Sequence, residues 1–170
     1  YAVGLLCDDH AAAGIKKALQ ENGANTEGLL LDASRPTIAK TRIIAGGRAT
    51  VSQQIVRIDK ESHQPMNKDF EQKILKYIEK LLPKIEGVVI SDYGSGTVTP
   101  AIQKQLIKCC RKRNIPSIVD SRYGIHEFKN IGYIKQNDAE LAAAVGRELS
   151  DEESLYDAGQ ELLNELSADG

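Results

Sequence analysis

The sequence that decides the fold reads G-V-V-I-S-D-Y-G-S-G at residues 87–96, I-P-S-I-V-D-S-R-Y-G at 115–124 and Y-I-K-Q-N-D-A-E-L at 133–141. Each segment carries the end of a short apolar run, and a long helical pattern separates the first two. Short apolar runs joined by a crossover helix are typical of a parallel sheet. Ligands of open α/β sheets bind beyond the carboxyl ends of the strands, so we expect a site where polar residues follow these runs.

Composition narrows the class of protein. The 170 residues, with 41% hydrophobic and 27% charged residues, suit one globular domain or most of one. A net charge of -2 gives no reason to expect nucleic acid or an anionic membrane as a partner. Three cysteines without metal-ligand spacing fit a reducing cytoplasm. The chain starts inside a strand pattern and stops after a helix, so we expect a domain that is incomplete at both ends.

Further elements follow from apolar periodicity and capping residues. We expect strands at 1–6, 29–31, 88–90, 117–119 and 133–134 and helices at 12–22, 67–82, 100–113, 138–145 and 151–166. Asp8 or Asp9 is expected to cap the first helix, because a carboxylate there accepts unpaired backbone N–H groups. A paired-acid phosphoacceptor site at these two residues is the weaker alternative.

Residues 37–45 and 51–59 form a hairpin-like pair of extended segments, separated by a loop that contains Gly46 and Gly47. Their faces read as mixed rather than apolar on one side. Two interpretations stay open: a solvated edge ribbon whose charges protect the edge, or a flap that closes over a polar ligand or pairs with a second subunit.

Two segments have the pattern of a helix capping box: Asn137-x-x-Glu140 and Ser150-x-x-Glu153. Their contexts differ, because Asn137 follows a strand of the expected parallel sheet whereas Ser150 follows a helix. A helix that begins at the carboxyl edge of such a sheet can hold a phosphate group, so the first box is both a structural cap and a candidate site.

Together these segments carry a resemblance. The ordered set is C-D-D-H at 7–10, R-P-T-I-A-K-T-R-I at 35–43, Q-Q-I-V-R-I-D-K-E at 53–61, V-V-I-S-D-Y-G-S-G at 88–96, V-D-S-R-Y at 119–123 and N-D-A-E at 137–140. In this order the motifs resemble the ribokinase-like (PfkB) carbohydrate kinases, and most closely their heptose-7-phosphate kinase branch. The resemblance covers almost the whole chain, although no single motif is specific.

The resemblance implies a ribokinase-like three-layer α/β/α sandwich with a mainly parallel sheet. Residues 1–170 would form part of one kinase domain, with 37–59 as a β-lid that covers the sugar and mediates a homodimer. The implied reaction is ATP-dependent phosphorylation of a hydroxyl on a sugar or sugar phosphate, with Mg2+ bridging phosphate oxygens. The expected partners are therefore the sugar substrate and a second copy of the chain.

The resemblance also implies roles for individual residues. Asn137 and Glu140 match the family's N-x-x-E motif beside the nucleotide phosphates, and Glu140 is the expected magnesium residue. The expected nucleotide contacts are Asn137, Asp138, Ala139, Glu140 and Asp120, and the expected substrate contacts are Asp92, Lys40 and Arg42. Asp92 and Asp120 are expected to face the same cleft from neighbouring strand ends, or else to cap the turns that follow them. Arg122 is a further candidate for a phosphate contact.

Some family features differ or are missing. Ser95 stands where heptose kinases usually have Lys, residues 121–123 replace a P-K-G segment, and Lys135-Gln136 replaces T-P. The glycine-rich sugar-binding region and the G-A-G-D motif, whose aspartate is the catalytic base, are not among these residues. We therefore expect the segment to be inactive alone. The alternative function is a non-catalytic α/β module that binds a nucleotide or a sugar phosphate.

Overall fold

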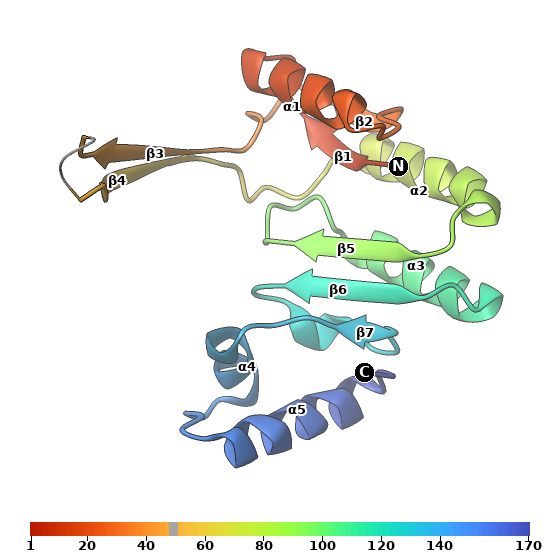
Figure 1. Ribbon diagram of the computed structural model, residues 1–170. Coiled ribbons are helices and arrows are strands. Elements are labelled where there is room, and N and C mark those ends of the chain that lie inside the picture. Colours follow the sequence, from red (N-terminus) through yellow and green to blue (C-terminus); the bar gives the residue numbers. More distant parts are fainter. Residues whose placement is uncertain (48–50) are drawn as a thin grey trace. The chain divides into compact units, whose positions relative to one another are not determined.

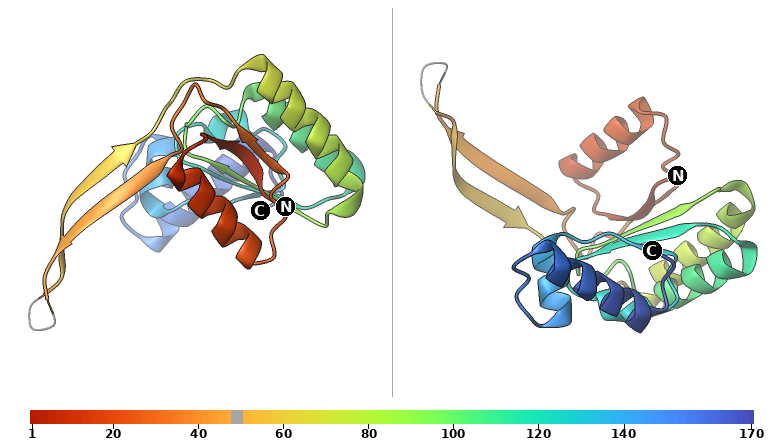
Figure 2. Two further views of the ribbon diagram at one scale, coloured as in Figure 1. Left: turned by 90° about the horizontal axis from the view of Figure 1, so that it is seen from above. Right: turned by 60° about the horizontal axis from the view of Figure 1, so that its bottom comes forward.

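The computed structural model describes residues 1–47 and 51–170, which divide into two compact units, Tyr1–Gln64 and Pro65–Gly170. Figure 1 shows their helices and strands, and Figure 2 gives two further views. The expected α/β class is confirmed, because helices alternate with strands and parallel pairing occurs in both units. None of the helices in this part of the chain is both long and apolar enough to cross a membrane.

The first unit begins with a parallel β-α-β element. Strands β1 (Val3–Leu6) and β2 (Gly28–Leu31) pair in parallel, and helix α1 (His10–Glu21) connects them. Asp9 caps α1 as predicted, because its Oδ1 accepts the N–H of Ala12 at 3.0 Å. Its Oδ2 accepts the N–H of Thr37 at 3.2 Å. These hydrogen bonds, first of all the one from Ala12, lower the pKa of Asp9.

The rest of the first unit is a two-stranded antiparallel ribbon of β3 (Ala39–Ala45) and β4 (Gln53–Lys60). The expected hairpin-like pair is confirmed, and residues 48–50 of the expected lid lie outside the described residues. The expectation of mixed faces holds at the ends of the ribbon and is wrong for its middle, where one face is apolar. Cross-strand partners share a face, and a β-bulge between Ile43 and Ile44 changes the phase of the pairing. One face therefore carries Ala39, Thr41, Ile43, Ala45, Gln53, Val56, Ile58 and Lys60, and the other carries Lys40, Arg42, Ile44, Gln54, Arg57 and Asp59.

The second unit contains the three-stranded parallel sheet expected from the decisive stretch. Its order is β5 (Val88–Asp92), β6 (Ser117–Ser121) and β7 (Tyr133–Ile134). Helix α2 (Lys68–Leu81) and the short 3-10 helix η1 (Leu82–Lys84) precede β5.

Helix α3 (Pro100–Arg113) crosses from β5 to β6, and the short 3-10 helix η2 (Ile125–Glu127) follows β6. Figure 1 shows α3 behind β5 and β6, and α2 above β5 in the same view.

Capping residues define the helix ends in this unit. Asn67 caps α2 and Thr99 caps α3, with Pro100 in the first turn, as predicted. After β7 come α4 (Asp138–Val145) and α5 (Glu152–Leu166), which contact each other.

The predicted cap of α5 is wrong by one residue. Asp151 caps this helix, and its Oδ1 accepts the N–H of Ser154 at 2.8 Å. A carboxylate is a stronger acceptor than the Ser150 hydroxyl, which explains the shift from the predicted Ser150 and Glu153.

The core of the second unit lies on one face of the sheet. Val119, Phe128, Ile131 and Leu166 are fully buried, and Ile90 of β5 lies on the same face as Val119. Apolar burial of this size typically stabilises a fold by about 1.5–3 kcal/mol per large side chain. On the opposite face, Val89 is 77% exposed. The two faces of this sheet therefore differ sharply, which matters for the side chains at its carboxyl edge.

Candidate functional site

The candidate site lies at the carboxyl edge of β5, β6 and β7. Because the three strands are parallel, the polar residues that end or follow them meet at one edge. Asp92 ends β5, Asp120 and Ser121 end β6, and Lys135 comes directly after β7. Helix α4 begins only a few residues further on, so its N-terminus belongs to the same edge.

Asp92 is held in place by its neighbours. Its Oδ1 accepts the N–H of Gly94 at 3.1 Å, which closes a turn after β5, and its Oδ2 accepts the hydroxyl of Ser121 at 3.2 Å. The predicted turn-capping role of Asp92 is thus confirmed. Gly94 has a φ of +68°, and the ring of Tyr123 lies 3.1 Å from the position a Cβ would take. Glycine is required here by both its conformation and this close approach.

Asp120 lies on the other face of the sheet. Ser121 pairs with Asp92 in the β5–β6 register, and Asp120 pairs with Ser91, so the pleat points Asp92 and Asp120 in opposite directions. The prediction that both carboxylates face the same cleft is wrong for this reason, although both lie at the same edge. The turn-capping alternative also fails for Asp120, since its only described hydrogen bond is accepted from Lys135.

Lys135 is a residue of this edge that sequence reasoning missed. Its ammonium lies 3.2 Å from Oδ2 of Asp120. The hydrogen bond and the charge of Asp120 raise the pKa of Lys135, and the nearby carboxylate of Glu140 and phenol of Tyr93 add to the effect. The available signal was a cation two residues before the N-x-x-E motif. It places one positive charge among the acidic residues of the edge.

Two buried oxygens at this edge accept no hydrogen bond from the described residues: Oδ1 of Asp120 and Oε1 of Gln136. The amide nitrogen of Gln136 donates to the carbonyl of Ser121 at 3.2 Å, which fixes the side chain. Buried acceptors without donors are rare in folded proteins. They are explained when a ligand hydroxyl, a water molecule or a cation satisfies them.

The first capping box is present as predicted. Oδ1 of Asn137 accepts the N–H of Glu140 at 2.9 Å, and Oε2 of Glu140 accepts the N–H of Asn137 at 3.0 Å. The backbone N–H groups of Asp138 and Ala139 make no hydrogen bond within the described residues. They remain available at the positive end of the helix dipole, where an anion is favoured.

The residues at this edge fit a magnesium ion that is shared with phosphate groups. No group of three or more His, Cys, Asp or Glu side chains that could hold a metal occurs in residues 1–47 and 51–170. Mg2+ usually takes one or two carboxylates and completes its shell with water and phosphate oxygens. Glu140 uses one oxygen in the capping box, and Asp120 has an oxygen without a donor. These two carboxylates match that incomplete shell.

The remaining predicted residues are Lys40 and Arg42 of the first unit and Arg122, which directly follows β6. Lys40 and Arg42 share the charged face of the ribbon, where Lys40 makes long ion pairs of 4.0 Å to Asp59 and 3.8 Å to Glu61. Arg42 pairs across the ribbon with Arg57, which concentrates positive charge on this face. In the second unit, the guanidinium of Arg122 lies 5.4 Å from the ring centre of Tyr123.

Comparison with known proteins covers nearly the whole chain. The profile of the pfkB family carbohydrate kinases matches residues 1–168. A protein named bifunctional protein HldE from Desulfatibacillum aliphaticivorans is 35% identical over 148 residues, which are 86% of this chain and 29% of that protein. The protein of the same name from Citrifermentans bemidjiense is 35% identical over 164 residues, or 95% of this chain and 32% of that protein. The chain thus spans about a third of these curated relatives.

Solved structures show the same fold at low sequence identity. Phosphofructokinase-2 from Escherichia coli in complex with substrates and products has a TM-score of 0.66 at 20% identity, over 96% of this chain and 52% of that one. Arabidopsis thaliana ribokinase complexed with ribose and ATP has a TM-score of 0.63 at 17% identity, over 96% and 51%. The expected ribokinase-like fold is confirmed.

Proposed function

The chain belongs to the pfkB family of carbohydrate kinases, and from this premise we propose that its full-length protein transfers the γ-phosphoryl group of ATP to a sugar phosphate, with a heptose 7-phosphate as the substrate. The resemblance to bifunctional HldE proteins supports this substrate. The observation that carries the proposal is the Asn137–Glu140 capping box beside Lys135 and Asp120 at the carboxyl edge of a parallel sheet.

Phosphoryl transfer needs charge neutralisation and positioning more than covalent chemistry from the protein. The free N–H groups of Asp138 and Ala139 and the ammonium of Lys135 would bind phosphate oxygens of ATP. Asn137 orients the first turn of α4 through its bond to the N–H of Glu140. When bound, Mg2+ supplies the charge that lets phosphates approach Asp120 and Glu140. Both carboxylates would hold this ion, directly or through water.

The substrate would be contacted by other residues. The carboxylate of Asp92 is held in place by hydrogen bonds from Gly94 and Ser121, so it can accept further hydrogen bonds from sugar hydroxyl groups without moving. Lys40 and Arg42 on the charged face of the ribbon would bind the phosphate group of the substrate. Charge supports this role, because Lys40, Arg42 and Arg57 outnumber the two carboxylates that pair with them, Asp59 and Glu61.

The opposite ribbon face supports a homodimer. Ile43, Val56 and Ile58 are adjacent on this face and 43–55% exposed. A two-stranded ribbon buries little of its own apolar surface. Burying these side chains against a second copy of the chain is therefore favourable. We therefore propose two roles for the lid. Its charged face contacts the substrate, and its apolar face forms the dimer.

The catalytic base would come from outside residues 1–170. None of the residues at the described edge matches a G-A-G-D motif, and the curated relatives extend over about three times the matched length. In this proposal residues 1–170 are part of one kinase domain, and the segment is inactive by itself. A cytoplasmic location, where ATP is available, completes the proposal.

The test is a transfer assay with the full-length protein, ATP and Mg2+. Heptose 7-phosphate, fructose 6-phosphate and ribose are offered separately, and 31P NMR follows formation of a new phosphate ester with release of ADP. Transfer with preference for heptose 7-phosphate supports the proposal. Binding of ATP without transfer to any of the sugars contradicts it and favours the non-catalytic binding module.

A further inference from the structure

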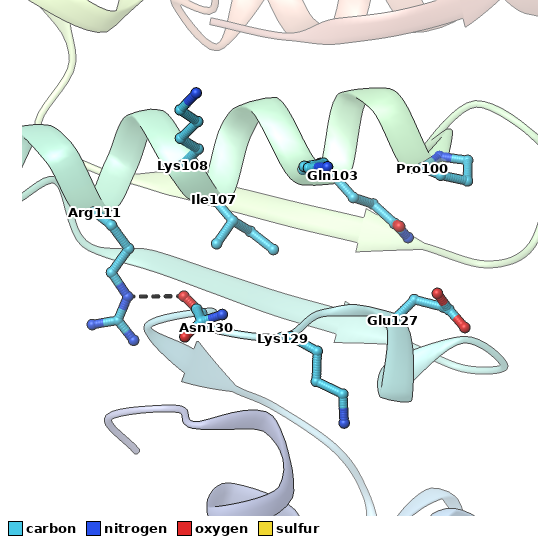
Figure 3. Close-up of a pocket in the computed structure, with 9 residues that line it drawn as sticks. Pro100, Gln103, Ile107, Lys108, Arg111, Glu127, Lys129 and Asn130 are labelled. Carbon is cyan, nitrogen blue, oxygen red and sulfur yellow. Dashed lines mark hydrogen bonds between the residues drawn. The ribbon is translucent and has the colours of Figure 1, made fainter.

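Helix α3 borders a pocket that the proposed kinase site does not use. Its volume is about 690 Å3, and it lies between α3 and the segment that follows β6 (Figure 3). The lining residues are Pro100, Gln103, Lys104, Ile107, Lys108 and Arg111 on α3, and Glu127, Lys129 and Asn130 on the opposite wall. All belong to the second unit. Pockets that bind small molecules commonly have volumes of about 300–1,000 Å3.

All charged side chains of α3 are positive. The helix carries Lys104, Lys108, Arg111, Lys112 and Arg113 and no Asp or Glu. The last three lie in its final turn, where cations are favoured by the helix dipole. Lys104 and Lys108 lie before that turn, so the dipole explains them poorly. As like charges four residues apart on one helix, they repel each other.

Lys104 and Lys108 also have no compensating partner in the described chain. Neither makes a hydrogen bond or an ion pair with residues 1–47 or 51–170. By contrast, the other cations of the pocket are engaged: Lys129 lies 2.8 Å from Glu165, and Arg111 lies 2.7 Å from Asp169. The two lysines therefore add an uncompensated positive charge to the helix that forms one wall of the pocket, and in Figure 3 the side chain of Lys108 extends away from the opposite wall.

The side chain of Gln103 gives the second, independent observation. Gln103 is only 8% exposed, yet its side chain makes no hydrogen bond with the described residues. Figure 3 shows Gln103 and Ile107 extending from α3 toward the opposite wall, which carries Glu127. The amide atoms of Gln103 are not among the buried atoms that lack a partner, so they open to the pocket, where a ligand can reach them.

From these contacts we infer that the α3 pocket binds a phosphorylated small molecule that also carries hydroxyl groups. Lys104 and Lys108 supply the cations for the phosphate, and the flexible side chain of Lys108 can turn toward it. The amide of Gln103 and the carboxylate of Glu127 accept hydrogen bonds from hydroxyl groups. Ile107 forms the apolar floor. The class includes sugar phosphates and nucleotides, which share this chemistry.

The pocket is connected to both strands of the candidate site. Helix α3 begins after the loop that leaves the carboxyl end of β5, and Glu127 to Asn130 follow the turn that leaves β6. Asp92 and Ser121, which bond each other, lie at these two strand ends. A ligand that draws α3 and residues 127–130 together would therefore shift the ends of β5 and β6, which position Asp92. This inference does not depend on the proposed kinase activity, because its test measures binding.

The experiment titrates the full-length protein with ribose 5-phosphate, ADP or inorganic phosphate, and follows the δ1 methyl group of Ile107 by NMR. This methyl reports the pocket separately from the Asn137 edge. The ribose 5-phosphate and ADP arms tell a sugar phosphate from a nucleotide, and inorganic phosphate tests for an anion site without hydroxyl recognition. We expect saturable shifts with at least one of the first two, at lower concentrations than with inorganic phosphate.

Three variants test the contacts. K104Q/K108Q is expected to weaken binding at least tenfold, because both cations that would bind the phosphate are lost. Q103L is expected to weaken it about fivefold. K112Q/R113Q removes the same charge from the same helix outside the pocket and is expected to bind normally. An unshifted Ile107 methyl, equal losses in both double variants, or equally tight binding of inorganic phosphate would each overturn the inference.

Discussion

Arg111 holds together three segments of the second unit, and its removal gives a measurable prediction. Its Nε donates to the carbonyl of Asn130 at 2.8 Å, and Nη2 donates to the carbonyls of Ile131 at 2.9 Å and Ser167 at 3.3 Å. Its Nη1 lies 2.8 and 2.7 Å from the two carboxylate oxygens of Asp169. One guanidinium thus fixes the segment before β7 and the segment after α5.

The cost of R111A follows from these contacts. The ion pair to Asp169 is 38% and 52% exposed at its two side chains, so it contributes only about 0.5 kcal/mol. The three carbonyl bonds come from a charged donor, but they are partly solvated, and each is worth about 0.5–1 kcal/mol. The free energy of unfolding should therefore fall by about 2–3 kcal/mol. R111K keeps the charge but not the fork, and we expect about half of this loss.

The matched control is R113A, in the same final turn of α3. Arg113 is exposed and makes no hydrogen bond with the described residues, so only its interaction with the helix dipole is lost, about 0.5 kcal/mol. Urea unfolding of the full-length protein, followed by circular dichroism, measures both variants with unchanged m-values. If the free energies of unfolding of R111A and R113A differ by less than about 0.5 kcal/mol, the stabilising role of the Arg111 contacts is refuted.

Three further predictions follow from the described contacts. The pKa of Asp32 is lowered, first by the hydroxyl of Ser34, so its stabilising effect is complete above pH 5 and is lost as pH falls below 3.8. In urea unfolding between pH 7 and 3, the midpoint of D32N should therefore fall less at acid pH than that of the unchanged protein. An equal fall in both proteins contradicts this prediction. G132A should destabilise by at least about 2 kcal/mol in urea unfolding, because its Cβ would lie 2.7 Å from the Ser117 carbonyl; a change below about 0.5 kcal/mol would show that the backbone adapts. V56D on the apolar ribbon face should give a monomer in light scattering, whereas Q54D on the charged face should not; equal masses for both variants argue against the dimer.

Local signals predicted the elements well. Asn67, Thr99 and Pro100, and the Asn137–Glu140 box, mark helix starts where the structure has them, because capping depends on neighbouring residues alone. The error at Ser150 has the same local origin, since Asp151 is the adjacent and stronger acceptor.

Features that depend on register could not be predicted. The β-bulge next to Ile43 sets which ribbon residues share a face, and no local pattern reveals a bulge. The opposite directions of Asp92 and Asp120 depend on how β5 aligns with β6, which is a non-local property. Lys135 could not be assigned without the contact to Asp120 that this alignment creates. Sequence thus locates the edge, and pairing decides which side chains act together there.

The central claim is that the Asn137–Glu140 segment is the nucleotide site of a carbohydrate kinase, and E140Q in the full-length protein tests it most directly. Glutamine at this position can still close a capping box, so the free energy of unfolding should change by less than about 0.5 kcal/mol. Loss of the carboxylate should lower Mg2+-dependent turnover at least about tenfold, while E152Q, which removes a first-turn carboxylate of α5, should leave it unchanged. Strong destabilisation by E140Q with intact turnover would contradict the claim and make the segment a helix cap only.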